Sequence, residues 1–232
     1  MLVIDTVFCC GYDFSEGLAA VGVQSGWEWG YIDKTGNLVV NPQFGHAYPF
    51  SEGLAAVLVG NSSNAKYGFV DKTGKLVINP QFTNVGSFSE GLAPVCVAVG
   101  DSYKWGYIDK TGKLAVDPEF DHAYAFSEGL AAVRVGDYYT GKGGFIDKTG
   151  KLVVSPQFDA AAGIEPGPFS EGLAAVAVGG RCGYIDRVGK YAVNPQFADA
   201  GPFAGGLAQI RTSGGEIGYI DKTGKYVWTP TK

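Results

Sequence analysis

Carboxylates recur at two regular places along the chain, and these residues are the best placed to do chemistry. One set lies in a repeated Phe-Ser-Glu-Gly segment: Glu16, Glu52, Glu90, Glu128 and Glu171. The other set opens a repeated Gly-containing turn: Asp33, Asp71, Asp109, Asp147, Asp186 and Asp221. A ladder of carboxylates could bind calcium. Equivalent acids at equivalent turns are more typical of side chains that accept backbone N–H bonds, so we expect both sets to be structural.

Two histidines form a second candidate site. His46 and His122 occupy the same place in the segments FGHAY and FDHAY, where Cys10 and Asn84 also fall. A zinc site needs three or four ligands within tetrahedral reach, so these residues could meet on a metal only in a tightly curled array. We expect them to cap loops. Because no Ser-His-Asp arrangement, phosphate loop or acid pair stands out, the sequence predicts a protein that is not an enzyme, with no metal and no cofactor.

The elements that carry these residues are repeats. The stretch WGYIDKTGKLAVDPEF at 105–120 has six copies, whose first residues are Trp29, Tyr67, Trp105, Gly143, Cys182 and Ile217. Two runs of aromatic and β-branched residues flank a short turn, which predicts a β-hairpin. We expect Gly112 to adopt a left-handed conformation in that turn, and Asp109 to accept N–H bonds across it.

A further strand precedes each hairpin, in the segment FSEGLAAV and its variants. One face of this strand is small and apolar, as in Ala131, Val133 and Val135. Because proline cannot donate to a ladder, Pro94 favours an edge position for this strand. One equivalent place varies from copy to copy, and we predict that it points outward: Gly22, Leu58, Cys96, Arg134, Ala177 and Arg211.

All three strands of each unit are apolar on both faces, which predicts that neighbouring sheets cover one another. A single unit could not bury these faces alone. We expect an all-β fold, a tandem array of six three-stranded antiparallel β-meander repeats stacked face to face. Propeller blades usually have four strands, so we favour an open superhelix or solenoid over a closed six-bladed ring. We also expect the glycine beside each aromatic, such as Gly106, to admit a neighbouring ring or backbone.

The predicted domain organisation is one repeat domain over residues 1–232. Residues 1–14 form a partial unit, because LVIDTVFCCGYDF matches LVVNPQFGHAYPF. The glycines of the FSEG segments are 36, 38, 38, 43 and 34 residues apart, so insertions fall in loops. The units are approximately 14–49, 50–87, 88–125, 126–168, 169–202 and 203–232. The last lacks an obvious polar cap, and end-to-end self-association is therefore one expectation.

Composition excludes several classes of protein. The net charge of −5, without a basic block, argues against nucleic-acid binding. No apolar run could span a bilayer, so we expect no membrane insertion. The opening MLVIDTVFCC lacks a basic region and carries Asp5, so it does not resemble a signal peptide. The four cysteines do not recur with the repeat, which favours a reducing compartment and a cytoplasmic location.

These motifs closely resemble the bacterial WG-repeat family, also called KWG repeats. Lys104, Trp105 and Gly106 spell the KWG core, and FSEGLAxV follows WGYIDKTGKLxVxPxF in almost every copy. The family's Trp stands only at Trp29 and Trp105, and other residues replace it in the remaining copies. The resemblance implies an all-β, non-catalytic interaction module. It supplies no ligand and no site residues.

Two functions remain after these exclusions. The first is a scaffold that binds a protein or peptide partner through outward positions of the repeats, such as Leu58, Arg134 and Arg211. The second is a glycan or cell-wall binding module that stacks loop aromatics on sugar rings. Those aromatics lie between the FSEG strand and the hairpin: Trp27, Tyr103, Tyr138 and Tyr139.

Overall fold

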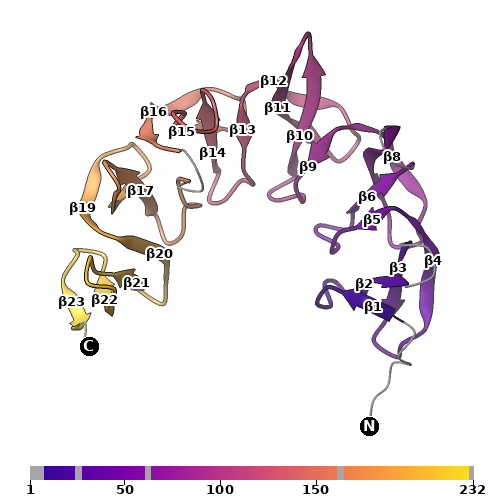
Figure 1. Cartoon of the computed structure of the whole chain (residues 1–232), viewed down its shortest axis with the longest axis horizontal. Helices are drawn as coiled ribbons and strands as arrows, with labels where there is room; N and C mark the ends of the chain where they lie inside the picture. Colours follow the sequence, from indigo (N-terminus) through magenta and orange to yellow (C-terminus); the bar gives the residue numbers. More distant parts are fainter. Residues whose placement is uncertain (1–7, 24–27, 61–63, 161–164, 230–232) are drawn as a thin grey trace. The chain divides into compact units, whose positions relative to one another are not determined.

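The computed structural model describes residues 8–23, 28–60, 64–160 and 165–229 (Figure 1). The regular elements of this part are β-strands, and it contains no α-helix. The chain divides into two compact units, Met1–Pro118 and Glu119–Lys232, and each is considered by itself. In both, consecutive strands pair antiparallel in chain order.

The first unit is built from three four-stranded sheets. The first sheet comprises β1 (Phe8–Gly11), β2 (Leu18–Val23), β3 (Trp29–Asp33) and β4 (Leu38–Phe44). The second sheet comprises β5 (His46–Ala47), β6 (Ala55–Val59), β7 (Lys66–Val70) and β8 (Leu76–Phe82). The third sheet comprises β9 (Asn84–Val85), β10 (Leu92–Val99), β11 (Ser102–Asp109) and β12 (Leu114–Phe120), the last of which ends just past the border of the unit.

The second unit continues the pattern with a seven-stranded and a four-stranded sheet. The larger sheet comprises β13 (His122–Ala123), β14 (Leu130–Val135), β15 (Lys142–Asp147), β16 (Leu152–Asp159), β17 (Ala174–Val178), β18 (Arg181–Ile185) and β19 (Tyr191–Phe197). The last sheet comprises β20 (Asp199–Ala204), β21 (Leu207–Arg211), β22 (Ile217–Asp221) and β23 (Tyr226–Trp228). A single bridge, Asp159 to Ala177, joins β16 to β17, so the larger sheet contains two repeats.

The prediction of three strands per repeat is wrong, because a further short strand precedes the FSEG segments that begin at Phe14, Phe50, Phe88 and Phe126. In β5, His46 pairs with Leu58 and Ala47 with Val57. Two residues carry no alternation that a sequence pattern could reveal. Each sheet therefore begins a few residues before the borders predicted at 50, 88 and 126. The residues expected to cap loops, His46 and His122, lie in these strands instead.

The FSEG strand is accordingly not a bare edge. In the third sheet, β10 lies between β9 and β11, and Pro94 O accepts a bond of 2.8 Å from Gly86 N. Pro94 pairs with Tyr107 on its other side. Proline is tolerated because the two-residue β9 pairs with Val95 and Cys96 only. The predicted edge position is thus corrected to a strand that is paired on both sides over part of its length.

The core lies between consecutive sheets, as the apolar faces predicted. In the first unit, Leu18 and Ala20 of β2 pack in one cluster with Ala55 and Val57 of β6. Ala56 of β6 joins the next cluster, with Ala93 and Val95 of β10. Alternate residues of β6 therefore enter two different interfaces. The same arrangement places Ala132 with Ala174, and Tyr184 with Ala208, in the second unit.

The glycine beside the aromatic of each hairpin is required by backbone of the same sheet. A Cβ on Gly106 would lie 2.5 Å from Val116 O and 2.8 Å from Pro118 N, both in β12. The equivalent Gly30 sits where the register of β3 against β4 shifts, between Trp29 and Tyr31. The close approach expected from the sequence is present. It occurs within one sheet and not between neighbouring sheets.

The hairpin turn matches its prediction. Gly112 has φ of +85°, in the left-handed region. The Asp109 carboxylate accepts bonds from Thr111 N, Thr111 Oγ1 and Lys113 N at 2.9, 2.6 and 3.1 Å. The hydroxyl bond of Thr111 lowers the pKa of Asp109 most, with the two N–H groups adding to it against slight desolvation. Equivalent bonds recur at Asp33, Asp71, Asp147 and Asp221.

Candidate functional site

Each sheet has two ends with different chemistry. One end carries the FSEG turn and the Asp-Lys-Thr-Gly turn, and we call it the latch end. The opposite end carries the loop between the two long strands after the FSEG segment, and we call it the variable end.

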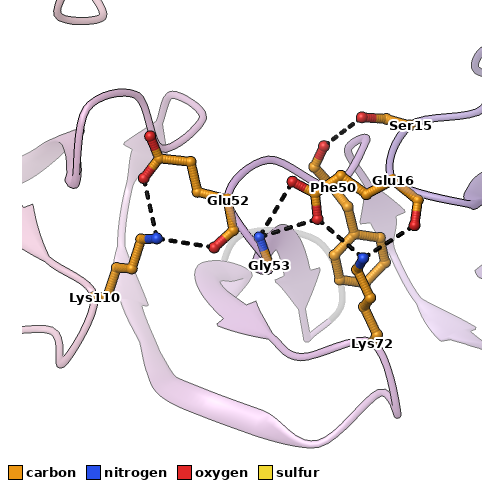
Figure 2. A network of polar contacts seen from close by, with 7 residues as sticks. All are labelled: Ser15, Glu16, Phe50, Glu52, Gly53, Lys72 and Lys110. Carbon is orange, nitrogen blue, oxygen red and sulfur yellow. Dashed lines mark hydrogen bonds and ion pairs between the residues drawn. The ribbon is translucent and has the colours of Figure 1, made fainter.

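A serine at the latch end bonds directly to the next repeat. Ser15 Oγ donates to Phe50 O at 2.6 Å (Figure 2). Ser51 Oγ repeats this bond to Phe88 O at 2.7 Å. In the second unit the pairs are Ser127 with Phe169 and Ser170 with Phe203. Each of these phenylalanines is buried, so the bond ties the backbone of a core residue to the preceding sheet.

The neighbouring glutamate contacts two residues of the next repeat (Figure 2). The Glu16 carboxylate accepts Gly53 N at 3.1 Å, and Lys72 Nζ lies 3.2 Å from Glu16 Oε2. Lys72 Nζ also donates to Glu16 O at 3.0 Å. The same set joins Glu52 to Gly91 and Lys110. Corresponding glutamates in the second unit are Glu128, with Gly172 and Arg187, and Glu171, with Gly206 and Lys222.

We call the Ser bond and the Glu contacts together the latch. Partial burial raises the pKa of Glu16, but the Lys72 ammonium and the Gly53 N–H outweigh it, so the pKa lies below its usual range. Glu16 also has φ of +52°, a conformation that costs free energy for any residue but glycine. The latch holds the residue there. The predicted structural role of these acids is therefore confirmed.

The partners of the glutamates were not identified from the sequence. The N–H groups belong to the following repeat, and the lysines come from its hairpin. The sequence did contain a signal for the basic partners, because a lysine or arginine follows the turn aspartate in every copy. The last FSEG segment reads Phe-Ala-Gly-Gly, so Ala204 and Gly205 replace the latch residues there.

At the variable end, one row of side chains crosses each sheet at the same level. Leu58 pairs with His46 on one side and with Tyr67 on the other. Arg134 pairs in the same way with His122 and Gly143. The equivalences read from the sequence are thus present in the register. Both rows begin with a histidine, and the other two residues differ in chemistry: Leu58 and Tyr67 in one, Arg134 and Gly143 in the other.

In the first unit the variable end gathers aromatic rings. The centroids of Trp29 and His46 lie 4.7 Å apart, as do those of His46 and Tyr48. Tyr12 lies 5.6 Å from Trp29, and Tyr67 lies 6.0 Å from Tyr48. Burial lowers the pKa of His46, so the imidazole is neutral at pH 7. Neutral rings with Tyr12 exposed at the margin form an amphipathic contact surface.

In the second unit, the side chains at the same level of the sheet are mostly polar. Arg134 is only 8% exposed, and its guanidinium lies 5.7 Å from the centroid of Tyr138. Its Nε has no hydrogen-bond partner among the described residues. Burial lowers the pKa of His122, which Glu165 partly offsets. Burial, with the nearby Glu165 carboxylate adding to it, raises the pKa of Tyr124 far above its usual value.

Two hollows open beside this polar cluster. One of about 230 Å³ is apolar and is lined by Tyr124, Ala125, Ala132, Pro166 and Pro168. Another of about 190 Å³ lies further along the unit, and its lining includes Glu165, Ala177, Cys182 and Asp199. The two hollows therefore offer an apolar and an acidic pocket, each large enough for a side chain.

The residues predicted to bind a partner differ in their exposure to solvent. Tyr103, Tyr138 and Tyr139 are 63%, 52% and 77% exposed, and the last two rings are in T-shaped contact at 5.3 Å. Arg211 is exposed and pairs with Asp199, whereas Leu58 is half-buried. The prediction that this row points outward is wrong at Cys96, Arg134 and Ala177, which are buried. The guanidinium of Arg134 lies against the ring of Tyr138. Trp27 lies outside the described residues.

The metal hypothesis gains no support. The described ranges contain no group of three or more His, Cys, Asp and Glu side chains able to hold an ion. They also contain no helix long and apolar enough to cross a membrane. Cys96 is buried and Cys182 half-buried in their sheets, consistent with packing roles.

The fold and its latches define a repeat protein of antiparallel β-sheets that pack face to face within each unit. The chain belongs to the family of proteins with WG-containing repeats. The profile of that family matches five segments, residues 29–62, 67–98, 105–139, 144–182 and 183–215. No curated protein sequence gives a significant match to the chain.

Solved structures of similar fold are β-propellers. A eukaryotic initiation factor shares 13% identity at a TM-score of 0.64, over 98% of this chain and 66% of that one. BamB from Moraxella catarrhalis shares 12% at 0.56, over 94% and 72%. Virginiamycin B lyase from Staphylococcus aureus shares 16% at 0.51, over 96% and 84%. The chain spans about two thirds of the first of these, and the likeness concerns the fold alone.

Proposed function

We propose that this chain is a non-catalytic scaffold that binds a protein or peptide partner at its variable end. One observation carries the proposal. The latch repeats the same contacts at junction after junction, whereas the row in line with Leu58 changes from Gly to Leu, Cys, Arg, Ala and Arg. Positions that vary from repeat to repeat, beside conserved packing contacts, are where repeat scaffolds place recognition.

The exposed chemistry at this end suits a peptide. Tyr138 and Tyr139 supply rigid amphipathic rings, which lose little conformational entropy on binding. The apolar hollow beside Tyr124 accepts an aliphatic or aromatic side chain. The hollow bordered by Glu165 and Asp199 favours a basic side chain. A peptide with an apolar and a basic residue therefore fits the second unit best.

A random-peptide display library selected on the whole chain tests this proposal. Selected peptides should lose most of their retention on Tyr138→Ala and on Asp199→Asn. Val188→Ala is the matched control, because Val188 is 76% exposed but lies at a latch-end turn. Equal loss of retention on the control, or unchanged retention on both variable-end variants, would contradict the proposal.

A glycan or cell-wall ligand is the second candidate. The exposures of Tyr103, Tyr138 and Tyr139 favour it, because sugar rings stack on such faces. A glycan array probed with the wild type, Trp27→Ala and Tyr138→Ala distinguishes the candidates. Binding to a sugar that both variants abolish supports the glycan reading, and the absence of retention on every sugar removes it.

We propose further that the array has six repeats and is open. Strand number does not favour the open form, since most of the sheets have four strands as propeller blades do. The support now comes from the latch. Ala204 and Gly205 leave the last repeat without the groups that would engage a following sheet. Small-angle scattering of the whole chain decides this, because a curved rod and a disc give different profiles. The KWG core and bacterial origin implied by the resemblance remain predictions.

A further inference from the structure

Two cysteines in β1 belong neither to the latch nor to the proposed peptide-binding surface. Cys9 and Cys10 are adjacent in β1, and both are exposed. In a regular strand, consecutive side chains point to opposite faces. Here the two Sγ atoms are 3.1 Å apart. The geometry of the strand explains the departure, because the register of β1 against β2 shifts between Phe8 and Cys10.

Contacts with β2 and β3 hold the two thiols on the same side of β1. The Cys9 thiol donates to Gly22 O at 3.4 Å. A Cβ on Gly22 would lie 2.7 Å from Cys10 Sγ and 3.2 Å from the Trp29 ring. Because Gly22 has no side chain at this row position, Cys10 fills the space beside Trp29. In the other sheets the row position carries a side chain: Leu58, Cys96, Arg134, Ala177 and Arg211.

We propose that Cys9 and Cys10 form a dithiol site that chelates a trivalent arsenical or a comparably thiophilic pyramidal centre. Two sulfurs bound at about 2.3 Å to a tetrahedral ion lie about 3.8 Å apart, and at a right angle about 3.3 Å apart. The spacing of 3.1 Å matches the smaller angle. Trivalent arsenic is pyramidal with bond angles near a right angle. The described residues also offer no third ligand for zinc.

The protonation state points the same way. The hydrogen bond to Cys9, followed by desolvation, raises the pKa of the Cys10 thiol, which is therefore protonated at pH 7. A divalent cation must displace thiol protons into solution, which becomes harder as the pKa rises. An arsenous group reacts without net proton release. In phenylarsine oxide, two As–S bonds form, the As=O bond breaks, and the two thiol protons leave with the oxygen as one water.

The test uses the whole chain, reduced with a monothiol, and phenylarsine oxide as the probe. Intact mass should show one phenylarsenic per chain, and two of the four thiols should become unreactive. A dithiol competitor should remove the adduct and a monothiol should not. Cys9→Ser and Cys10→Ser should each weaken binding by about 100-fold or more, because a second bond within one site acts at high effective concentration.

Cys96→Ser and Cys182→Ser are the matched controls and should bind as the wild type does. Emission of Trp29 should change on binding, and Trp29→Phe should remove that change. Unaltered melting of Cys9→Ser and Cys10→Ser shows that the variants are folded. A wild-type chain that takes up no arsenical, or an adduct that survives either serine variant, overturns the proposal.

Discussion

The latch end and the variable end belong to the same sheets but obey different rules. At the latch end, Ser15 and Ser51 bond to the next repeat within 0.1 Å of each other in length, and Glu16 and Glu52 repeat the same contacts. At the variable end, the first unit gathers neutral aromatic rings and the second gathers Arg134, Glu165 and exposed tyrosines. Repeated contacts therefore mark what holds consecutive sheets together, and we expect recognition where the repetition stops.

The largest effect on stability is expected within the strands, between the latch end and the variable end. Gly106→Val should lower the free energy of unfolding by about 3 kcal/mol or more, because the new side chain meets the backbone of β12. Gly45→Ala is the control, since its Cβ would meet nothing closer than 3.5 Å. Urea denaturation measures both. Similar midpoints for the two variants would show that Gly106 is not constrained as described.

Acid should weaken the latch end as a whole. The pKa values of Glu16, Glu52 and Asp109 lie below their unfolded values, so the ionised forms stabilise the fold. This contribution is fully present above the unfolded pKa of about 4.3 and is lost as the pH falls through the lowered values. Unfolding followed from pH 6 to pH 2 should show the decline below about pH 4. If the free energy of unfolding does not change across that range, the ionised latch carboxylates do not stabilise the fold.

A single latch should have a smaller effect, and the replacement residue should matter. Glu52→Ala removes the acceptor of Gly91 N and the partner of Lys110, at a cost of about 1 kcal/mol. Glu52→Gly removes the same contacts but relieves the φ of +53°, so it should be about 1 kcal/mol more stable than Glu52→Ala. Thermal melts of the two variants give the comparison. If alanine is the more stable, the backbone at Glu52 is not under strain.

The smallest effect on stability is expected at the variable end. Tyr138→Ala should change the free energy of unfolding by less than about 0.5 kcal/mol, because the ring is half exposed and lies on a loop. The same variant should reduce retention of a selected peptide. A melting shift comparable to that of Gly106→Val would place Tyr138 in the core and remove the distinction between the two ends.

The sequence predicted what the repeat makes periodic. Six copies of the hairpin located the turns, so Gly112 and the bonds to Asp109 could be anticipated. The apolar faces on both sides of each strand predicted that sheets would cover one another. The two-residue strands such as His46–Ala47 escaped prediction because they are too short to show a period.

Contacts between repeats could not be predicted in the same way. The role of Lys72 depends on a glutamate that is 56 residues earlier in the chain, and no local pattern connects the two. Arg134 was expected to point outward because its position varies from copy to copy. The loop that carries Tyr138 places its ring 5.7 Å from the guanidinium, and no local sequence pattern predicts that contact.

The most direct test measures both properties on one pair of variants. A latch variant, Glu52→Ala with Ser51→Ala, and a variable-end variant, Tyr138→Ala with Tyr139→Ala, are compared for melting temperature and for retention of a peptide selected on the wild type. The account predicts that the first melts lower and still retains the peptide, while the second melts as the wild type does and loses it. Loss of retention in the latch variant below its melting temperature, with full retention in the tyrosine variant, would contradict the account.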